Sequence, residues 1–309
     1  SVFLLKFLEM KKIQMVDLQS QYQKIKNEVD EKVLNVMQSA QFINGPEVQN
    51  FQKELEQYLG VKHVIPCANG TDALQIALMA LDLQPGDEVI TADFTFAATV
   101  EVVHLLKLKS VLVDVDYDTF NIDIEKLKAA ITPKTKAIIP VHLFGQCANM
   151  EAVLEVAKEH NLFVVEDNCQ GIGADYTFSD GTVKKSGTMG TIGTTSFFPS
   201  KNLGCYGDGG AIFTNDDELA YKMRGIVNHG MYKRYYHDEV GVNSRLDSVQ
   251  AAVLRVKLPL LDSYNAARRS AADYYDKAFA NHPNILTPKR AENSTHVFHQ
   301  YTLRILNGK

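Results

Sequence analysis

Short apolar runs alternate with helix-like segments between residues 63 and 166, and this alternation constrains the fold more than any other feature of the sequence. The runs with the composition of buried strands lie at 63–67, 88–91, 110–114, 137–141 and 162–166. Segments with a helical pattern separate them, at 72–81, 95–106, 124–130 and 150–160. Because each run is apolar almost throughout, both of its faces must be covered. The pattern predicts an α/β fold with a mostly parallel central sheet flanked by helices.

Helical patterns also occur on both sides of this region. Apolar residues recur at helical spacing over 16–40, and Pro46 suits the first turn of a second helix that reaches about Leu59. The elements expected after Thr214 are helices at 216–226 and 247–279, a boundary at 281–284 and a strand at 301–306.

These elements predict a division of the 309 residues into three parts. We expect an N-terminal extension at 1–12, because Met10 resembles a natural start, and a large domain at 13–245. Residues 246–309 are then expected to form the start of a small α/β C-terminal domain, which is truncated because few residues remain to build it.

The composition argues against several classes of function. A net charge of −5 argues against nucleic-acid binding. No apolar run approaches the roughly 18 residues that a membrane helix needs, so no membrane partner is expected. Widely spaced cysteines without a C-x-x-C pair predict neither a zinc site nor a disulfide framework, and they fit a cytoplasmic protein. They are Cys67, Cys147, Cys169 and Cys205.

One lysine stands among glycines after a β-prone run. The run ends at Ser196, Pro199 prevents its continuation as a strand, and Lys201 follows, with Gly204 and Gly207 beyond it. A lysine in such a tight, mostly uncharged setting is a candidate covalent amine, because desolvation favours its unprotonated form. The alternative is a surface lysine in a hairpin, since lysine side chains are mostly exposed.

Three other places carry residue types suited to a phosphate and a flat ring. Gly70 and Thr71 open a helix after a strand, where N–H groups and a hydroxyl can bind phosphate or simply cap the helix. Asp167 ends an apolar run, where it can keep a heteroaromatic nitrogen protonated or anchor a loop. Phe96 can stack on a ring or join the core.

These features occur in the order phosphate cradle, aromatic loop, strand-end carboxylate and glycine-flanked lysine. Pyridoxal 5'-phosphate has a phosphate, a flat face, a basic ring nitrogen and an aldehyde, so it would use all four. Two other residues near predicted strand ends or loops are less decisive. His142 is interpreted as a structural histidine, and Arg245 as an arginine suited to carboxylate or phosphate contact or simply exposed.

Four motifs identify a family that the chain resembles. They are NGTDAL (69–74), EDNCQGIGA (166–174), SFFPSKNLGCYGDGGA (196–211) and GVNSRLDSVQAA (241–252). Together they resemble the sugar aminotransferases of the DegT/DnrJ/StrS group, which are fold-type I pyridoxal phosphate enzymes. The likeness runs from about Val16 to the end of the sequence.

This resemblance implies a role for each matching residue. Lys201 would bond covalently to the cofactor aldehyde, Asp167 would pair with the pyridine nitrogen, and Gln170 would reach the ring oxygen. The phosphate would be held by Gly70, Thr71 and Ser196, and Phe96 would stack on the ring. Asn243 would reach the phosphate from a partner subunit, which makes the expected enzyme a homodimer with shared active sites. The role of Arg245 is left open.

The resemblance also implies a reaction, in which glutamate donates an amino group to a keto group of a nucleotide-linked sugar. GCYGDGGA and GVNSRLD favour the 3-position of the sugar over the 4-position, and cell-surface polysaccharide precursor synthesis is the expected setting. A dehydratase of the family has histidine in place of the lysine, so Lys201 argues against that activity. A non-catalytic regulatory or binding protein is the alternative from another class.

The sequence departs from the family pattern in two places. The stretch 176–188 is slightly long and is interpreted as a surface hairpin. Members of the family also continue for some tens of residues beyond the position of Lys309, in a part that would complete the small domain.

Overall fold

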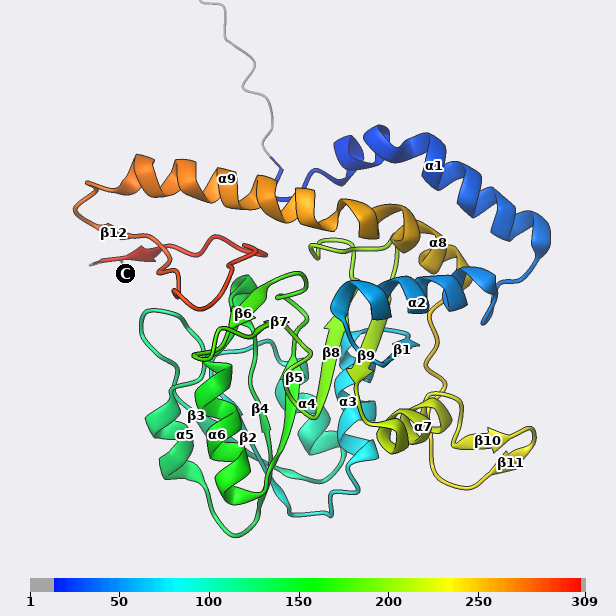
Figure 1. Ribbon diagram of the computed structural model, residues 1–309, viewed down its shortest axis with the longest axis horizontal. Coiled ribbons are helices and arrows are strands. Elements are labelled where there is room, and N and C mark those ends of the chain that lie inside the picture. The colour runs from blue at the N-terminus through cyan, green and yellow to red at the C-terminus, as the bar shows by residue number, and fades with distance from the viewer. Residues whose placement is uncertain (1–13, 307–309) are drawn as a thin grey trace, which may run out of the picture.

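A seven-stranded sheet forms the centre of the computed structural model, which describes residues 14–306. Its strands, in spatial order, are β1 (His63–Cys67), β9 (Gly210–Thr214), β8 (Ile192–Ser196), β5 (Phe163–Asp167), β4 (Thr135–Ile139), β2 (Glu88–Ala92) and β3 (Lys109–Val113) (Figure 1). The strands from β8 to β3 run parallel, whereas β9 is antiparallel to both of its neighbours. The predicted mostly parallel sheet is confirmed.

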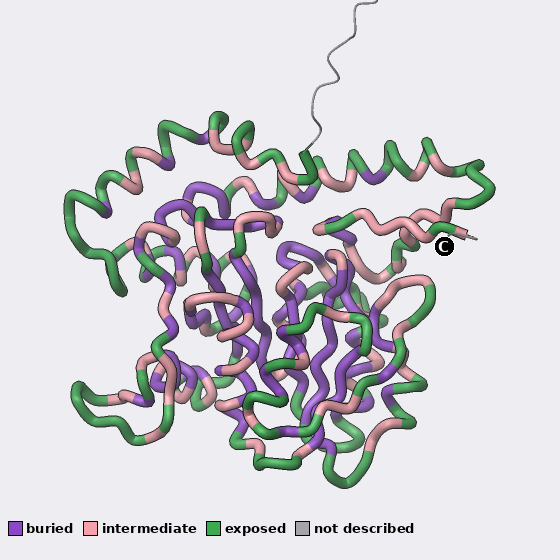
Figure 2. The backbone as a smooth tube through the Cα atoms, turned by 180° about the vertical axis from the view of Figure 1, so that it is seen from behind, coloured by how far each residue is buried: buried purple, intermediate pink, exposed green. Residues whose placement is uncertain are grey.

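Helices cover both faces of this sheet. One face packs against the helices α3 (Gly70–Ala80), α4 (Ala98–Leu105) and α7 (Asp217–Ile226). The helices on the other face are α2 (Pro46–Leu59) and α8 (Ser248–Lys257) over one half, and α5 (Ile124–Ala130) and α6 (Met150–His160) over the other. Successive strand residues therefore enter different cores: Val64 packs with α2, and Ile65 with α3. Figure 2 shows the resulting burial of the central strands.

Pro259 divides the helical stretch that we predict as one helix over 247–279. The structure instead has α8, a 3-10 turn η2 (Leu258–Leu260) and α9 (Leu261–Phe279). The prediction of one continuous helix is wrong because proline has no N–H to donate to the preceding turn and its ring crowds that turn.

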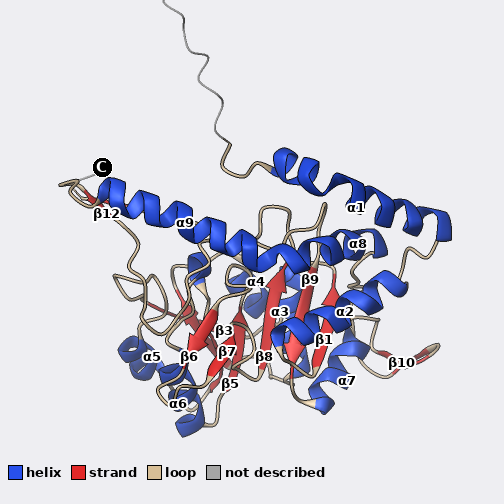
Figure 3. Cartoon of the chain, turned by 45° about the horizontal axis from the view of Figure 1, so that its top comes forward, coloured by secondary structure: helices blue, strands red, loops and turns tan. Residues whose placement is uncertain are grey.

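Near the N-terminus, α1 (Leu18–Ser39) packs against α8. Both α1 and α9 lie at the end of the sheet towards which β8 points (Figures 1 and 3).

The segment after α9 returns to the edge of the sheet. The N–H of Val297 donates to the carbonyl of Gly145 at 2.8 Å, in the 3-10 turn η1 (Leu143–Gly145). The strand predicted at 301–306 is reduced to β13 (Arg304–Ile305), because its antiparallel partner β12 (Ile285–Leu286) offers only two residues.

Two small hairpins lie outside the central sheet. β6 (Asp175–Thr177) pairs with β7 (Val183–Lys185), which agrees with the hairpin expected at 176–188, although Tyr176 is fully buried. β10 (Met231–Lys233) pairs with β11 (Tyr236–His237).

The predicted extension at 1–12 lies outside the described residues, and the domain division at 245/246 stays a prediction. No helix among residues 14–306 combines the length and apolar character needed to cross a membrane.

The aromatic pair Phe51 and Phe197 ties α2 to the end of β8, with ring centroids 5.4 Å apart at an interplanar angle of 77°. Both side chains are fully buried. We predict that Phe51→Ala lowers the free energy of unfolding by about 3–5 kcal/mol, because the truncation leaves a cavity in a packed core. Tyr274→Ala, on an exposed side chain of α9, is the control and should have little effect. Equal midpoints for the two variants in urea denaturation would contradict this assignment.

Candidate active site

A cavity of about 710 Å³ opens at the carboxyl ends of the central strands. Seven of the predicted site residues line it: Gly70, Thr71, Phe96, Asp167, Gln170, Ser196 and Lys201. They come from the start of α3, the loop after β2, the ends of β5 and β8, and the loops that follow β5 and β8. Their convergence follows from the parallel arrangement, because the carboxyl ends of such strands meet at one edge.

The start of α3 forms the part of the cavity that is suited to binding a phosphate. Asn69 caps the helix by accepting the N–H of Asp72 at 2.8 Å, so the alternative interpretation of a capped helix also holds. The first N–H groups of a helix have no partner within it and can bind an anion. A Cβ on Gly70 would lie 2.7 Å from Cβ of Ser196, so glycine is what lets the helix start approach the end of β8.

Asp167 presents a buried carboxylate to the cavity. It is 5% exposed, and its Oδ2 accepts a hydrogen bond from the hydroxyl of Thr99 at 2.9 Å. Its Oδ1 accepts the N–H of Cys169 at 3.2 Å. Donors on both oxygens fix the orientation of this carboxylate, and a carboxylate in this place can hold a protonated ring nitrogen through a charge-assisted hydrogen bond.

Gln170 is oriented by a backbone donor. Its Oε1 accepts the N–H of Phe144 at 2.7 Å, so its Nε2 can donate to an oxygen in the cavity. Phe144 reaches this position with a left-handed backbone, at φ 57° and ψ 2°, which is unusual for a bulky residue. Phe96 is 70% exposed at the cavity wall, where its ring is available to a ligand rather than packed in the core.

The loop that carries Lys201 is closed tightly on itself. The N–H of Lys201 donates to the carbonyl of Phe198 at 2.8 Å. A Cβ on Gly204 would lie 2.4 Å from the carbonyl oxygen of Pro199. A second lysine, Lys257 of α8, is 1% exposed and donates from Nζ to the carbonyl of Gly204 at 2.7 Å. Lys257 therefore braces the turn that positions Lys201.

Two predicted residues do not line the cavity. Asn243 is exposed and pairs through its backbone with Asn228. Arg245 is half-buried and also outside the lining. His142 is confirmed as a structural histidine, because it is fully buried and hydrogen-bonded to Glu166 at 2.7 Å.

Sequence analysis missed His299 and Gln300, which line the cavity from the C-terminal segment. Nδ1 of His299 is buried and has no hydrogen-bond partner among residues 14–306. Burial, helped by the charges of Lys201 and Arg268, lowers the pKa of His299 to about 3, so the ring is neutral near pH 7. No spacing rule connects this residue with Lys201; the bond between Val297 and Gly145 brings the segment to the cavity.

The cavity thus unites an amine, a carboxylate, an amide donor, an aromatic face and a helix N-terminus. This donor set fits pyridoxal phosphate, and the unpartnered nitrogen of His299 leaves a polar contact for a bound molecule.

Residues 23–309 match the DegT/DnrJ/EryC1/StrS aminotransferase family. The chain belongs to this family, and the predicted family, fold class and enzyme class are confirmed.

Similar proteins include both enzymes and a protein with a regulatory name. The chain is 49% identical over 295 residues to UDP-2-acetamido-2-deoxy-3-oxo-D-glucuronate aminotransferase from Pseudomonas aeruginosa. The alignment covers 96% of this chain and 80% of that protein. It is also 49% identical over 294 residues to the pleiotropic regulatory protein of Geobacillus stearothermophilus, with coverage of 94% and 78%. Among solved structures, NtdA from Bacillus subtilis with bound cofactor PMP has a TM-score of 0.87 and 34% identity, covering 97% of this chain and 68% of that one.

Lys257 makes stability depend on pH. Burial lowers its pKa from 10.5 to about 8, so the folded protein releases this proton before the unfolded chain does. Below pH 8 both states are protonated, and the cost of the buried charge is present in full. As the pH rises from 8 to 10.5 that cost is removed, so the free energy of unfolding rises by up to about 3 kcal/mol relative to Lys257→Met.

The measurement is chemical denaturation of both proteins at several pH values from 7 to 10.5. The methionine variant is the reference, because all titrating groups other than Lys257 are the same in the two proteins. A difference between the two proteins that stays constant over this range would contradict a buried, proton-releasing Lys257.

Proposed function

We propose that this protein is a pyridoxal phosphate-dependent aminotransferase that moves an amino group from glutamate to a keto group of a nucleotide-linked sugar. The observation that carries the proposal is the meeting of Lys201, Asp167 and the start of α3 in one cavity. An unspecialised surface lysine would not face a buried carboxylate and a helix N-terminus together.

The predicted site residues that line the cavity would each have a defined contact with the cofactor. Gly70, Thr71 and Ser196 would hold the phosphate, with Phe96 against the face of the ring. The carboxylate of Asp167 would hold the ring nitrogen in its protonated form, and the amide of Gln170 would donate to the ring oxygen.

Lys201 would perform the proton transfers. When bound, pyridoxal phosphate supplies an aldehyde that condenses with amines and a ring that accepts electron density from the carbon being deprotonated. The amine of Lys201 would remove the proton from the α-carbon of glutamate, and it would later deliver a proton to the sugar carbon that receives nitrogen. Neutral His299 would hydrogen-bond a polar group of the substrate through its unpartnered nitrogen.

The similarity to the Pseudomonas aeruginosa enzyme supports a 3-keto sugar as substrate, since its name specifies a 3-oxo sugar. Amination at the 4-position is the alternative within the family. The regulatory name of the Geobacillus stearothermophilus protein supports a non-catalytic function as the second candidate. Polysaccharide precursor synthesis and a cytoplasmic location remain part of the proposal.

We also propose that the active enzyme is a homodimer. Asn243 is exposed and lies outside the cavity lining of its own chain, as expected for a residue that reaches the phosphate of a partner's site.

Lys201→Ala should abolish the absorbance band of the covalent bond between the lysine and pyridoxal phosphate, and it should lower turnover by about a thousandfold or more. Lys62→Ala is the control, because Lys62 pairs with Asp217 outside the cavity lining. Absorbance spectroscopy measures the band of the bound cofactor, and mass spectrometry of the products measures turnover. A panel of nucleotide-linked 3-keto and 4-keto sugars with glutamate identifies the position of the new amine. Wild-type protein that stays colourless with added cofactor would favour the regulatory alternative.

Shared active sites predict complementation between inactive variants. Lys201→Ala and Asn243→Ala are each expected to have little activity, because each damages both sites of its homodimer. In a mixed dimer one site contains both intact residues, so mixing the purified variants should restore activity. Activity that stays at the level of the separate variants after verified subunit exchange would contradict a shared site.

A further inference from the structure

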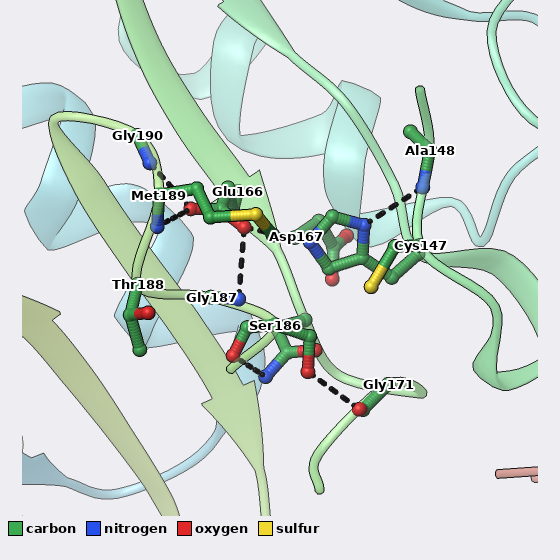
Figure 4. A network of polar contacts seen from close by, with 12 residues as sticks. Cys147, Ala148, Glu166, Asp167, Gly171, Ser186, Gly187, Thr188, Met189 and Gly190 are labelled. Carbon is green, nitrogen blue, oxygen red and sulfur yellow. Dashed lines mark hydrogen bonds and ion pairs between the residues drawn. The ribbon is translucent and has the colours of Figure 1, made fainter. Parts of the chain in front are cut away.

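A second buried carboxylate lies beside Asp167 on the opposite face of the sheet. Glu166 precedes Asp167 on β5, and alternation along a strand directs the two side chains to opposite faces. Glu166 is fully buried. Its oxygens accept backbone N–H groups from one loop: Oε1 from Met189 at 2.6 Å and Gly190 at 2.5 Å, and Oε2 from Gly187 at 2.8 Å. Figure 4 shows Glu166 reached by this loop on one side.

His142 supplies the remaining donor, from the other side of Glu166. Its Nε2 lies 2.7 Å from Oε2 of Glu166, and its Nδ1 accepts the N–H of Ala148 at 3.2 Å. Because Nδ1 accepts a hydrogen bond, Nε2 is the ring atom that donates to the carboxylate. Every partner of Glu166 is then a donor, so both of its oxygens are satisfied by hydrogen bonds.

The same histidine also holds the backbone of Asp167. The N–H of His142 donates to the carbonyl of Asp167 at 3.0 Å, and the N–H of Asp167 donates to the carbonyl of Pro140 at 2.9 Å. These bonds extend the parallel pairing beyond the end of β4 at Ile139. His142 therefore binds Asp167 through its main chain and Glu166 through its ring.

On the cavity side, Asp167 has fewer restraints. Its carboxylate contacts the hydroxyl of Thr99 and the N–H of Cys169. The direction in which it points thus depends on the orientation of the strand end, which is held by pairing with β8 on one side and by the bonds of His142 and Glu166.

We propose that His142 and Glu166 are positioning residues, which aim the carboxylate of Asp167 into the cavity before the cofactor binds. This inference rests on the proposed function, because Asp167 is there the partner of the ring nitrogen. Neither residue lines the cavity, so their effect is transmitted through β5.

The test uses His142→Phe, which keeps a ring but removes the donor to Glu166. We expect the dissociation constant of pyridoxal phosphate, measured by titrating the cofactor-free protein, to rise about tenfold or more, since a hydrogen bond to a charged group is lost. The absorbance of the bound cofactor changes with pH, and the midpoint of this change should also move upward. Without its carboxylate partner the ring nitrogen holds its proton less firmly, and the unprotonated ring withdraws electrons less strongly. His142→Gln, which retains an amide donor, should restore part of both quantities.

Glu88→Gln is the matched control for buried carboxylates. Glu88 is 3% exposed at the start of β2, at the opposite end of the sheet, and it is bonded to Lys109 and Thr132. This variant should lose stability while its cofactor affinity and pH midpoint stay at the wild-type values. Glu166→Gln provides the second variant, with the same changes expected as for His142→Phe, and it decides the question if His142→Phe does not fold.

The outcomes separate this inference from the proposed function. Wild-type protein that binds pyridoxal phosphate, together with His142→Phe or Glu166→Gln variants of unchanged affinity and pH midpoint, would overturn the positioning role alone. Equal changes in Glu88→Gln would also overturn it, since they would reflect general destabilisation. Failure of the wild-type protein to bind the cofactor would overturn both proposals.

Discussion

Burial of the central sheet on both faces dictates where polar chemistry can lie in this protein. The middle of each inner strand is packed between two layers of helices, and a polar side chain there needs a hydrogen-bond partner within the protein, as Thr91 has in the carbonyl of Ile139. Hydrogen-bonding side chains therefore gather where strands end and backbone N–H groups are available. In the parallel part of the sheet, the carboxyl ends of β2, β4, β5 and β8 meet at one edge, and the cavity lies there.

Buried charges stabilise the groups around this edge and also constrain them. Glu166 is compensated by donors on both oxygens, and Lys257 donates to the carbonyl of Gly204 beneath the loop of Lys201. Removing one partner from such a pair is costly, because the remaining group stays buried without its hydrogen bond. The two supports lie under different parts of the cavity, one beside Asp167 and the other beside Lys201. The positions of both groups are thus set by residues outside the cavity lining.

Local sequence signals predicted much of the site because local rules govern its parts. Gly70 and Thr71 open a helix directly after a strand, and Asp167 ends an apolar run, so their surroundings depend on neighbouring residues. The alternation of strands and helices in turn required a parallel sheet that brings such ends together. The same local reasoning failed at Pro259. The helical pattern of the flanking residues predicted a continuous helix, whereas the proline interrupts it in the structure. It also failed to find His299, whose place depends on backbone bonds to a turn more than a hundred residues earlier.

The sequence alone determined the α/β class, the order of the strands along the chain and the family, because hydrophobic periodicity and motif residues are properties of short segments. Only the tertiary structure decided the spatial order of the strands, the arrival of His299 in the cavity and the pairing of His142 with Glu166. These contacts join segments that are distant in the chain, and their geometry follows from how the layers pack, which no local pattern contains. The protonation states of His299 and Lys257 belong to the same group, since burial within the packed structure sets them.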